Sequence, residues 1–303
     1  MTADVGRHAP EAPDDPGAPT GLGFVKGHGT ENDFVLVPDI HGQVTLTPDR
    51  VQRLCDRRAG IGGDGLIRIV PTRLADEPEI RVMAPRAAWF MDYHNADGSA
   101  AELCGNGTRV FAAYLVREGL EGEATFAIAT RAGIKTVQVT PEGYAVSLGR
   151  ARVDTTDNAV GPSGTTMVTI ADGLELPGLR VDVGNPHTVV TLTPDLVLAG
   201  LDLSTTPQVT PEPPEGTNVE YVQVVGPSHI AMRVVERGVG ETRSCGTGAV
   251  AAAAATRWRQ GPTSTNATWT VDVPGGRLTV TFDGDQAQLA GPAELVADGT
   301  TGL

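Results

Sequence analysis

Hydrophobic and polar residues alternate along much of the chain, and this period of two predicts β-strands. The clearest such segments are residues 34–37, 66–70, 135–139, 144–148, 167–170, 221–225, 230–235 and 278–282. Two further segments, 104–118 and 245–260, begin near glycines, continue with small apolar residues and end before Gly119 and Gly261, which predicts helices. Because their first turns carry few polar residues, we expect both helices to be buried on all sides.

Three short segments of the first half recur in the second half in the same order, which indicates an internal repeat. The pairs are residues 32–33 and 185–186, 44–51 (VTLTPDRV) and 190–197 (VTLTPDLV), and 104–107 (CGNG) and 245–248 (CGTG). In both copies of the middle segment a threonine is placed to cap a helix that begins at Pro48 or Pro194. The Pro- and Thr-rich stretch 202–216 is expected to be a loop.

We therefore predict an α/β (α+β) fold of two pseudo-symmetric halves, each a curved, mostly antiparallel sheet wrapped around one central helix. The N-terminal half spans residues 22–149, with a C-terminal strand at 290–303 returning to it, and the C-terminal half spans 150–289. Residues 1–21 are rich in proline and acids and have no apolar run, so we expect a disordered tail.

Composition removes several classes of function. The net charge of −14 argues against a nucleic-acid or anionic-membrane partner, and no apolar run approaches the roughly 20 residues that span a bilayer. Three cysteines without dense spacing argue against a disulfide framework and favour a cytoplasmic location. The two lysines and six scattered histidines show no Schiff-base context and no metal-ligand spacing, so we expect no cofactor and no metal.

A cysteine stands directly before each of the two predicted helices. The N–H groups and dipole of a helix start stabilise an anion, which is expected to lower a thiol pKa from about 8.5 toward neutrality. Two such thiols facing one ligand can remove a proton from one side of a stereocentre and deliver another to the opposite side. Cys104 and Cys245 are therefore the predicted acid/base pair of a cofactor-independent racemase or epimerase, whereas Cys55, in the helix predicted at 48–56, is expected to be core.

The segments around these cysteines resemble the diaminopimelate epimerase family over nearly the whole chain after the tail. The matching segments are residues 26–35, 95–99, 104–107, 184–187, 217–219 and 236–242 followed by 245–248. The resemblance implies interconversion of LL- and meso-2,6-diaminopimelate for lysine and peptidoglycan synthesis, in a cleft between two α/β halves, by a homodimer without cofactor. It implies substrate contacts from Asn32, Asn95, Gly105, Asn106, Asn185, Asn218, Glu236, Arg237, Gly246 and Thr247.

The chemistry of these side chains suits a substrate with two amino-carboxylate ends. Amide carbonyls and Glu236 can accept from an ammonium group, and amide N–H groups and Arg237 can donate to a carboxylate. His187 either supports the protonation state of a cysteine or makes a structural hydrogen bond. Glu31 stands where the family often has Gly, and Gly65 stands where many members have Gln. No role is assigned to residues 85–91.

Three other kinds of protein use similar features. A racemase of proline or hydroxyproline has the same broad fold, but typically carries His where Asn106 stands. The phenazine-biosynthesis-like isomerases share the fold without the cysteine pair. A non-catalytic protein that binds a zwitterionic amino acid needs the helix starts and the amides, but it does not need a thiol in both halves. Such a protein would show no turnover, and Cys104→Ser would bind the ligand as the wild type does.

Overall fold

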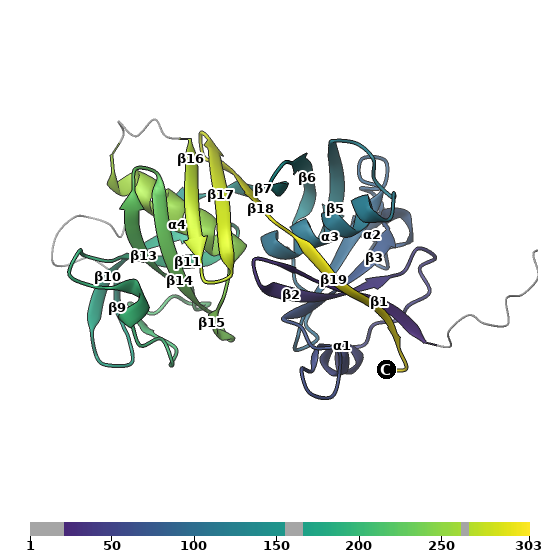
Figure 1. Ribbon diagram of the computed structural model, residues 1–303, viewed down its shortest axis with the longest axis horizontal. Coiled ribbons are helices and arrows are strands. Elements are labelled where there is room, and N and C mark those ends of the chain that lie inside the picture. Colours follow the sequence, from purple (N-terminus) through teal and green to yellow (C-terminus); the bar gives the residue numbers. More distant parts are fainter. Residues whose placement is uncertain (1–20, 155–165, 262–266) are drawn as a thin grey trace, which may run out of the picture.

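The computed structural model describes residues 21–154, 166–261 and 267–303, and in it two curved sheets each surround one long helix (Figure 1). The helices are α3 (Gly105–Arg117) and α4 (Gly246–Arg259), and most of their residues are buried, as predicted. Each is followed by a glycine of positive φ, 66° at Gly119 and 86° at Gly261, which ends a helix without steric cost. The predicted fold class is confirmed. The predicted tail lies, except for Gly21, outside the described residues.

The strands of the first half pair in chain order, and two of the pairings are parallel. The strands are β1 (Leu22–Gly29), β2 (Asn32–Pro38), β3 (Gly65–Pro71), β4 (Trp89–Asn95), β5 (Thr125–Thr130), β6 (Gly133–Thr140) and β7 (Gly143–Arg150). β2–β3 and β4–β5 are parallel and the other neighbours antiparallel. Parallel strands need crossover connections, which α1 (Pro48–Cys55) and α3 supply. Cys55 is buried on α1, as expected.

The second half repeats this order of pairings. Its corresponding strands are β10 (Glu175–Asp182), β11 (Pro186–Thr191), β13 (Asn218–Gly226), β14 (His229–Glu236), β16 (Thr268–Val273), β17 (Gly276–Asp283) and β18 (Gln286–Gly291). Here β11–β13 and β14–β16 are parallel and the other neighbours antiparallel. A short strand, β15 (Gly240–Thr242), pairs with β14 and leads into α4. The shared topology supports the internal repeat.

The two halves exchange strands. β7 pairs with β18, which joins the sheets, and β8 (Arg152–Val153) goes on to pair with β10 of the second half. In return β19 (Glu294–Thr301), which follows β18, pairs with β1 and crosses the first half as the yellow strand of Figure 1. These pairings tie the two halves together. The boundary between residues 149 and 150 stays a prediction.

Two local predictions in the second half are wrong. No α-helix begins at Pro194: the chain makes a turn and then a 3-10 helix, η2 (Leu198–Gly200). The apolar residues that follow, including Leu201 and Leu203, are buried in a hydrophobic cluster of the second half. Their packing there therefore overrides the local preference for a helix. The expected loop 202–216 contains a strand, β12 (Gln208–Thr210), which pairs with β9 (Thr166–Thr169) and buries Val209.

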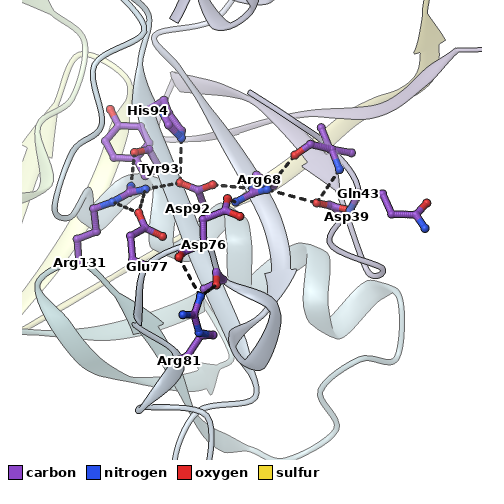
Figure 2. A network of polar contacts seen from close by, with 12 residues as sticks. Asp39, Gln43, Arg68, Asp76, Glu77, Arg81, Asp92, Tyr93, His94 and Arg131 are labelled. Carbon is purple, nitrogen blue, oxygen red and sulfur yellow. Dashed lines mark hydrogen bonds and ion pairs between the residues drawn. The ribbon is translucent and has the colours of Figure 1, made fainter. Parts of the chain in front are cut away.

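The connection from β3 to β4 contains the segment to which no role was assigned. It forms the 3-10 helix η1 (Thr72–Leu74) and α2 (Pro78–Arg81), then turns through residue 86 and enters β4 at Trp89. A buried polar network anchors it, in which Arg68 and Arg131 both bind Asp92 and reach the acidic residues of the connection (Figure 2). Among the described residues, no helix is long and apolar enough to cross a membrane.

Candidate active site

The two predicted catalytic cysteines occupy equivalent places at the starts of α3 and α4. Each is the N-cap of its helix, and each Sγ accepts a backbone N–H at 3.4 Å, from Gly107 for Cys104 and from Gly248 for Cys245. The two helix starts touch, since a Cβ on Gly246 would lie 3.3 Å from the backbone nitrogen of Asn106 and 2.8 Å from Leu289. Glycine at 246 therefore permits the close approach of the two helices at the junction of the halves.

The side chain beside Cys104 is Asn32, at the start of β2. Its Oδ1 lies 3.7 Å from Cys104 Sγ and 3.2 Å from Asn106 Nδ2, and its Nδ2 donates to Asp64 at 2.7 Å. Arg57 in turn donates to Asp64 at 2.8 Å. Since the Asn32 carboxamide is held from both ends, its oxygen is directed to the Cys104 thiol.

A second chain of hydrogen bonds leads to Cys245. Its Sγ lies 3.5 Å from the Thr247 hydroxyl, which receives Asn185 Nδ2 at 3.4 Å. His187 Nε2 lies 3.0 Å from Asn185 Oδ1, and His187 Nδ1 lies 2.7 Å from Glu220 Oε1, deep in the protein. Glu220 was missed by the sequence analysis, although an acid within the apolar run 219–222 (VEYV) is the kind of signal that could have revealed it.

The remaining predicted contacts lie at strand ends. Asn218 Oδ1 accepts the backbone N–H of Arg237 at 2.9 Å, and the Glu236 carboxylate accepts from the hydroxyl of Thr242. The Arg237 side chain is exposed and donates to the carbonyl of Glu215. These residues join the end of β14 to the start of β13.

Asn95 ends β4 and binds Ser99 Oγ at 3.0 Å, and it pairs across the sheet with Gly65. A Cβ at Gly65 would come within 2.7 Å of the Tyr93 ring and of the His94 carbonyl oxygen, so this packing leaves no room for the Gln that the family often has there. Burial raises the pKa of Tyr93, and Cys104 adds to the increase, so this ring lies near the first thiol. Glu31 adopts a φ of 61°, which explains why glycine suits that position.

A cavity of about 500 Å³ is lined by residues of the second half between 152 and 217, and neither Cys104 nor Cys245 is among them. Asn185, His187 and Thr217 line one part of it, and Arg152 and Arg180 line another. The cavity therefore reaches the buried histidine from the side of the second half. Within residues 21–154, 166–261 and 267–303, no three His, Cys, Asp or Glu side chains are grouped so as to hold a metal ion.

The predicted fall of the thiol pKa values is wrong. Burial raises the pKa of Cys104 to about 12 and raises that of Cys245 well above its ordinary value. The N–H groups of Gly107 and Gly248 act in the opposite direction but do not compensate for lost hydration of the thiolate. The charge of Glu236 raises both pKa values further, and burial raises the pKa of Glu236 itself.

Comparison with known proteins agrees with this geometry. Residues 24–153 and 179–296 match the family model described as diaminopimelate epimerase. The chain is 51% identical to the diaminopimelate epimerase of Streptomyces coelicolor, covering 92% of this chain and 95% of that one. It is 48% identical to that of Thermobifida fusca, covering 92% and 98%.

Solved structures of more distant proteins share the fold. A phenazine biosynthesis protein of the PhzF family from Bacillus anthracis superposes with a TM-score of 0.62 at 19% identity, covering 93% of this chain and 99% of that one. A hydroxyproline epimerase from Agrobacterium vitis gives 0.61 at 14% identity, covering 92% and 90%. The identities of about half to the first two relatives, over nearly the full length, decide the assignment: the chain belongs to the diaminopimelate epimerase family.

Proposed function

We propose that this protein is an isomerase that interconverts LL- and meso-2,6-diaminopimelate, a step of lysine biosynthesis that also serves peptidoglycan. The observation that carries the proposal is the pair of cysteines, each capping one of two helices whose starts touch, in a chain of the diaminopimelate epimerase family. A racemase of proline has less use for Arg237 and for the asparagines gathered around the two thiols.

The reaction uses Cys104 and Cys245 as base and acid. One thiolate removes the α-proton and becomes a thiol, while the other thiol protonates the opposite side of the carbon and becomes a thiolate. The reverse reaction exchanges their roles. Backbone N–H groups of Gly105, Asn106, Gly246 and Thr247 bind the α-carboxylate, where negative charge develops as the proton leaves.

The side chain of Asn106 has a different role from its backbone. Its carboxamide is fully buried and bonded to Asn32, Arg109 and Ser244, so only its N–H group is assigned to substrate. We assign Asn32 and Asn95, both in the first half, to the reacting end of the substrate.

The other end of the substrate is assigned to the second half. Arg237, Asn185 and Asn218 offer donors for the distal carboxylate, and Glu236 offers an acceptor for an ammonium group. His187 lies between Glu220 and Asn185, so it acts on this set by holding the Asn185 carboxamide. This favours a supporting role at the substrate site over direct action on a cysteine.

Solvent exchange tests the proposal. The reduced protein is incubated with LL-diaminopimelate in D2O, and NMR follows the α-protons together with the LL/meso ratio. Deuterium at one α-carbon alongside meso product is expected from wild type and from the control Cys55→Ala, but not from Cys104→Ala. No exchange in wild type, with exchange of proline or another amino acid instead, would overturn the substrate assignment.

The resemblance also supports a homodimer, a cytoplasmic location and a reaction without cofactor. Light scattering on the purified protein tests the first of these. Turnover that persists after exhaustive dialysis with a chelator and a carbonyl reagent tests the last, because a metal or pyridoxal group would be removed or blocked.

A further inference from the structure

Arg109 is a buried cation whose partners are all neutral. It lies on α3, is 0% exposed, and donates to Asn106 Oδ1 at 2.6 Å, to Thr30 Oγ1 at 3.3 Å and to the carbonyl of Pro292. Its Nε has no partner among the described residues. A guanidinium without a carboxylate is unfavourable in a protein interior, and burial lowers the pKa of Arg109 to about 10.

The groups that Arg109 holds lead to both thiols. Asn106 Nδ2 donates to Asn32 Oδ1 and to both oxygens of Ser244, each at 3.2 Å, and the Thr30 hydroxyl lies 2.7 Å from the Ser244 hydroxyl. Asn32 is the side chain beside Cys104. Ser244 comes from the second half and directly precedes Cys245. One guanidinium thus connects to both cysteines across the junction.

We propose that Arg109 is a positioning residue for the epimerisation, holding Cys104 and Cys245 in register by fixing the Asn106 carboxamide and the Thr30 hydroxyl between the two halves. The inference rests on the proposed function. It adds a residue that contacts neither a thiol nor, in the proposed mechanism, the substrate. The Pro292 carbonyl extends the same link to the segment between β18 and β19, which also crosses between the halves.

The charge of Arg109 acts unequally on the two thiols. The charge of Glu236, on β14, raises the pKa of Cys104, and the charge of Arg109, on the same helix as Cys104, lowers it. The charge of Cys104 in turn raises the pKa of Tyr93, on β4. The charges that act most strongly on Cys245 are Glu236 and Glu220, which both raise its pKa. Loss of Arg109 should therefore raise the pKa of Cys104 selectively.

The test compares Arg109→Met and Arg109→Lys with Arg117→Met, a control on the same helix whose arginine is partly exposed and pairs with Asp298. In R109M we expect kcat to fall about 100-fold, the typical cost of misplaced catalytic groups. Alkylation of Cys104 by iodoacetamide, followed by peptide mass spectrometry across pH, should slow about tenfold per unit of pKa increase, with Cys245 much less affected. R109K should restore Cys104 alkylation but not kcat, because lysine lacks the planar fork.

Two results would overturn the proposal. The first is a wild-type kcat in R109M or in R109K. The second is equally slowed alkylation of both thiols together with a lowered unfolding temperature. If R109M does not fold, R109K decides by its kcat and by its Cys104 alkylation profile. The alkylation measurement needs no substrate. Lack of epimerisation by wild type would therefore count against the proposed function, whereas an unaltered variant would count against Arg109 alone.

Discussion

Buried charges occur in two regions of the part of the chain that the structure describes, and they are paired differently in each. In the network behind β3 and β4, Asp92 lies 2.7 Å from Arg68 and 2.6 Å from Arg131, and those arginines also bind Asp76 and Glu77 (Figure 2). At the junction of the halves, Arg109 has only neutral partners. Glu220 has one oxygen on His187 and the other without a hydrogen-bond partner among the described residues. The charges of the first region form carboxylate–guanidinium pairs that anchor a connection, whereas Arg109 at the junction has no carboxylate partner within the described ranges.

The junction itself is asymmetric, although the halves share one topology. Arg109 lies on the helix that Cys104 begins. Glu220 lies against the start of the other helix, since a Cβ on Gly248 would be 2.7 Å from its Oε1. A repeated backbone therefore places equivalent thiols in different electrostatic surroundings, which is one way to give an acid and a base different tasks.

Removing either thiol has the largest expected effect. Cys104→Ala and Cys245→Ala should each lower kcat by about 10²–10⁴-fold, because each loses one of the two proton-transfer groups. Cys55→Ala, which removes a thiol from the buried face of α1, should retain turnover. Steady-state kinetics with LL- and meso-diaminopimelate measure this, and substantial turnover in either site variant would contradict the two-base mechanism.

The paired network should carry stability and not catalysis. Asp92→Asn removes the carboxylate that Arg68 and Arg131 share, while Asp76 and Glu77 still pair with them, so we expect the free energy of unfolding to fall by about 1–3 kcal/mol. Wild-type kcat is expected in the folded variant. Chemical denaturation measures the free energy of unfolding, and the exchange assay measures kcat. An unchanged unfolding midpoint would mean that the paired network does not stabilise the fold, and the difference proposed between it and the junction would be lost.

The same network predicts how stability depends on pH. Burial alone would raise the pKa of Asp92, but His94, Arg131 and Arg68 lower it overall to well below its ordinary value. A carboxyl with a lowered folded-state pKa stabilises the protein above its unfolded pKa of about 3.9 and loses that contribution as pH falls below it. Denaturation between pH 6 and pH 3 should show a steeper loss in wild type than in D92N.

Activity should rise with pH over the neutral and mildly alkaline range. Burial raises the pKa of both active-site thiols, so the thiolate fraction grows up to about tenfold per pH unit below the pKa. A profile of kcat/KM that is flat or falling between pH 7 and pH 9 would contradict the raised thiol pKa values, because kcat/KM reports the ionisation of the free enzyme. The measurement requires a reducing buffer throughout.

Replacing Glu220 should change the junction in the direction opposite to replacing Arg109. Glu220→Gln removes a negative charge that raises the pKa of Cys245, so alkylation of Cys245 should accelerate by up to about tenfold while Cys104 changes little. A several-fold lower kcat is expected because His187 loses its charged partner. Equal changes at both thiols would mean that the two surroundings are not electrostatically distinct.

Local sequence was sufficient where short-range physics decides. Alternation predicted strands such as β14, and the glycines at both ends of α3 and α4 predicted those helices within a residue or two. The repeated CGxG segment located both cysteines because each caps the first turn of its own helix. The same reasoning was wrong at Pro194, where buried leucines outweigh a valid capping signal.

The sequence by itself determined the repeat, the two central helices and the cysteine at the start of each, because these depend on residues adjacent in the chain. Only the tertiary structure decided the electrostatics of the site. Arg109 and Glu220 acquire their roles from Thr30, Pro292 and His187, which are remote in sequence. The pKa of each thiol depends on how completely water is excluded, and that exclusion arises from two halves closing around both helix starts.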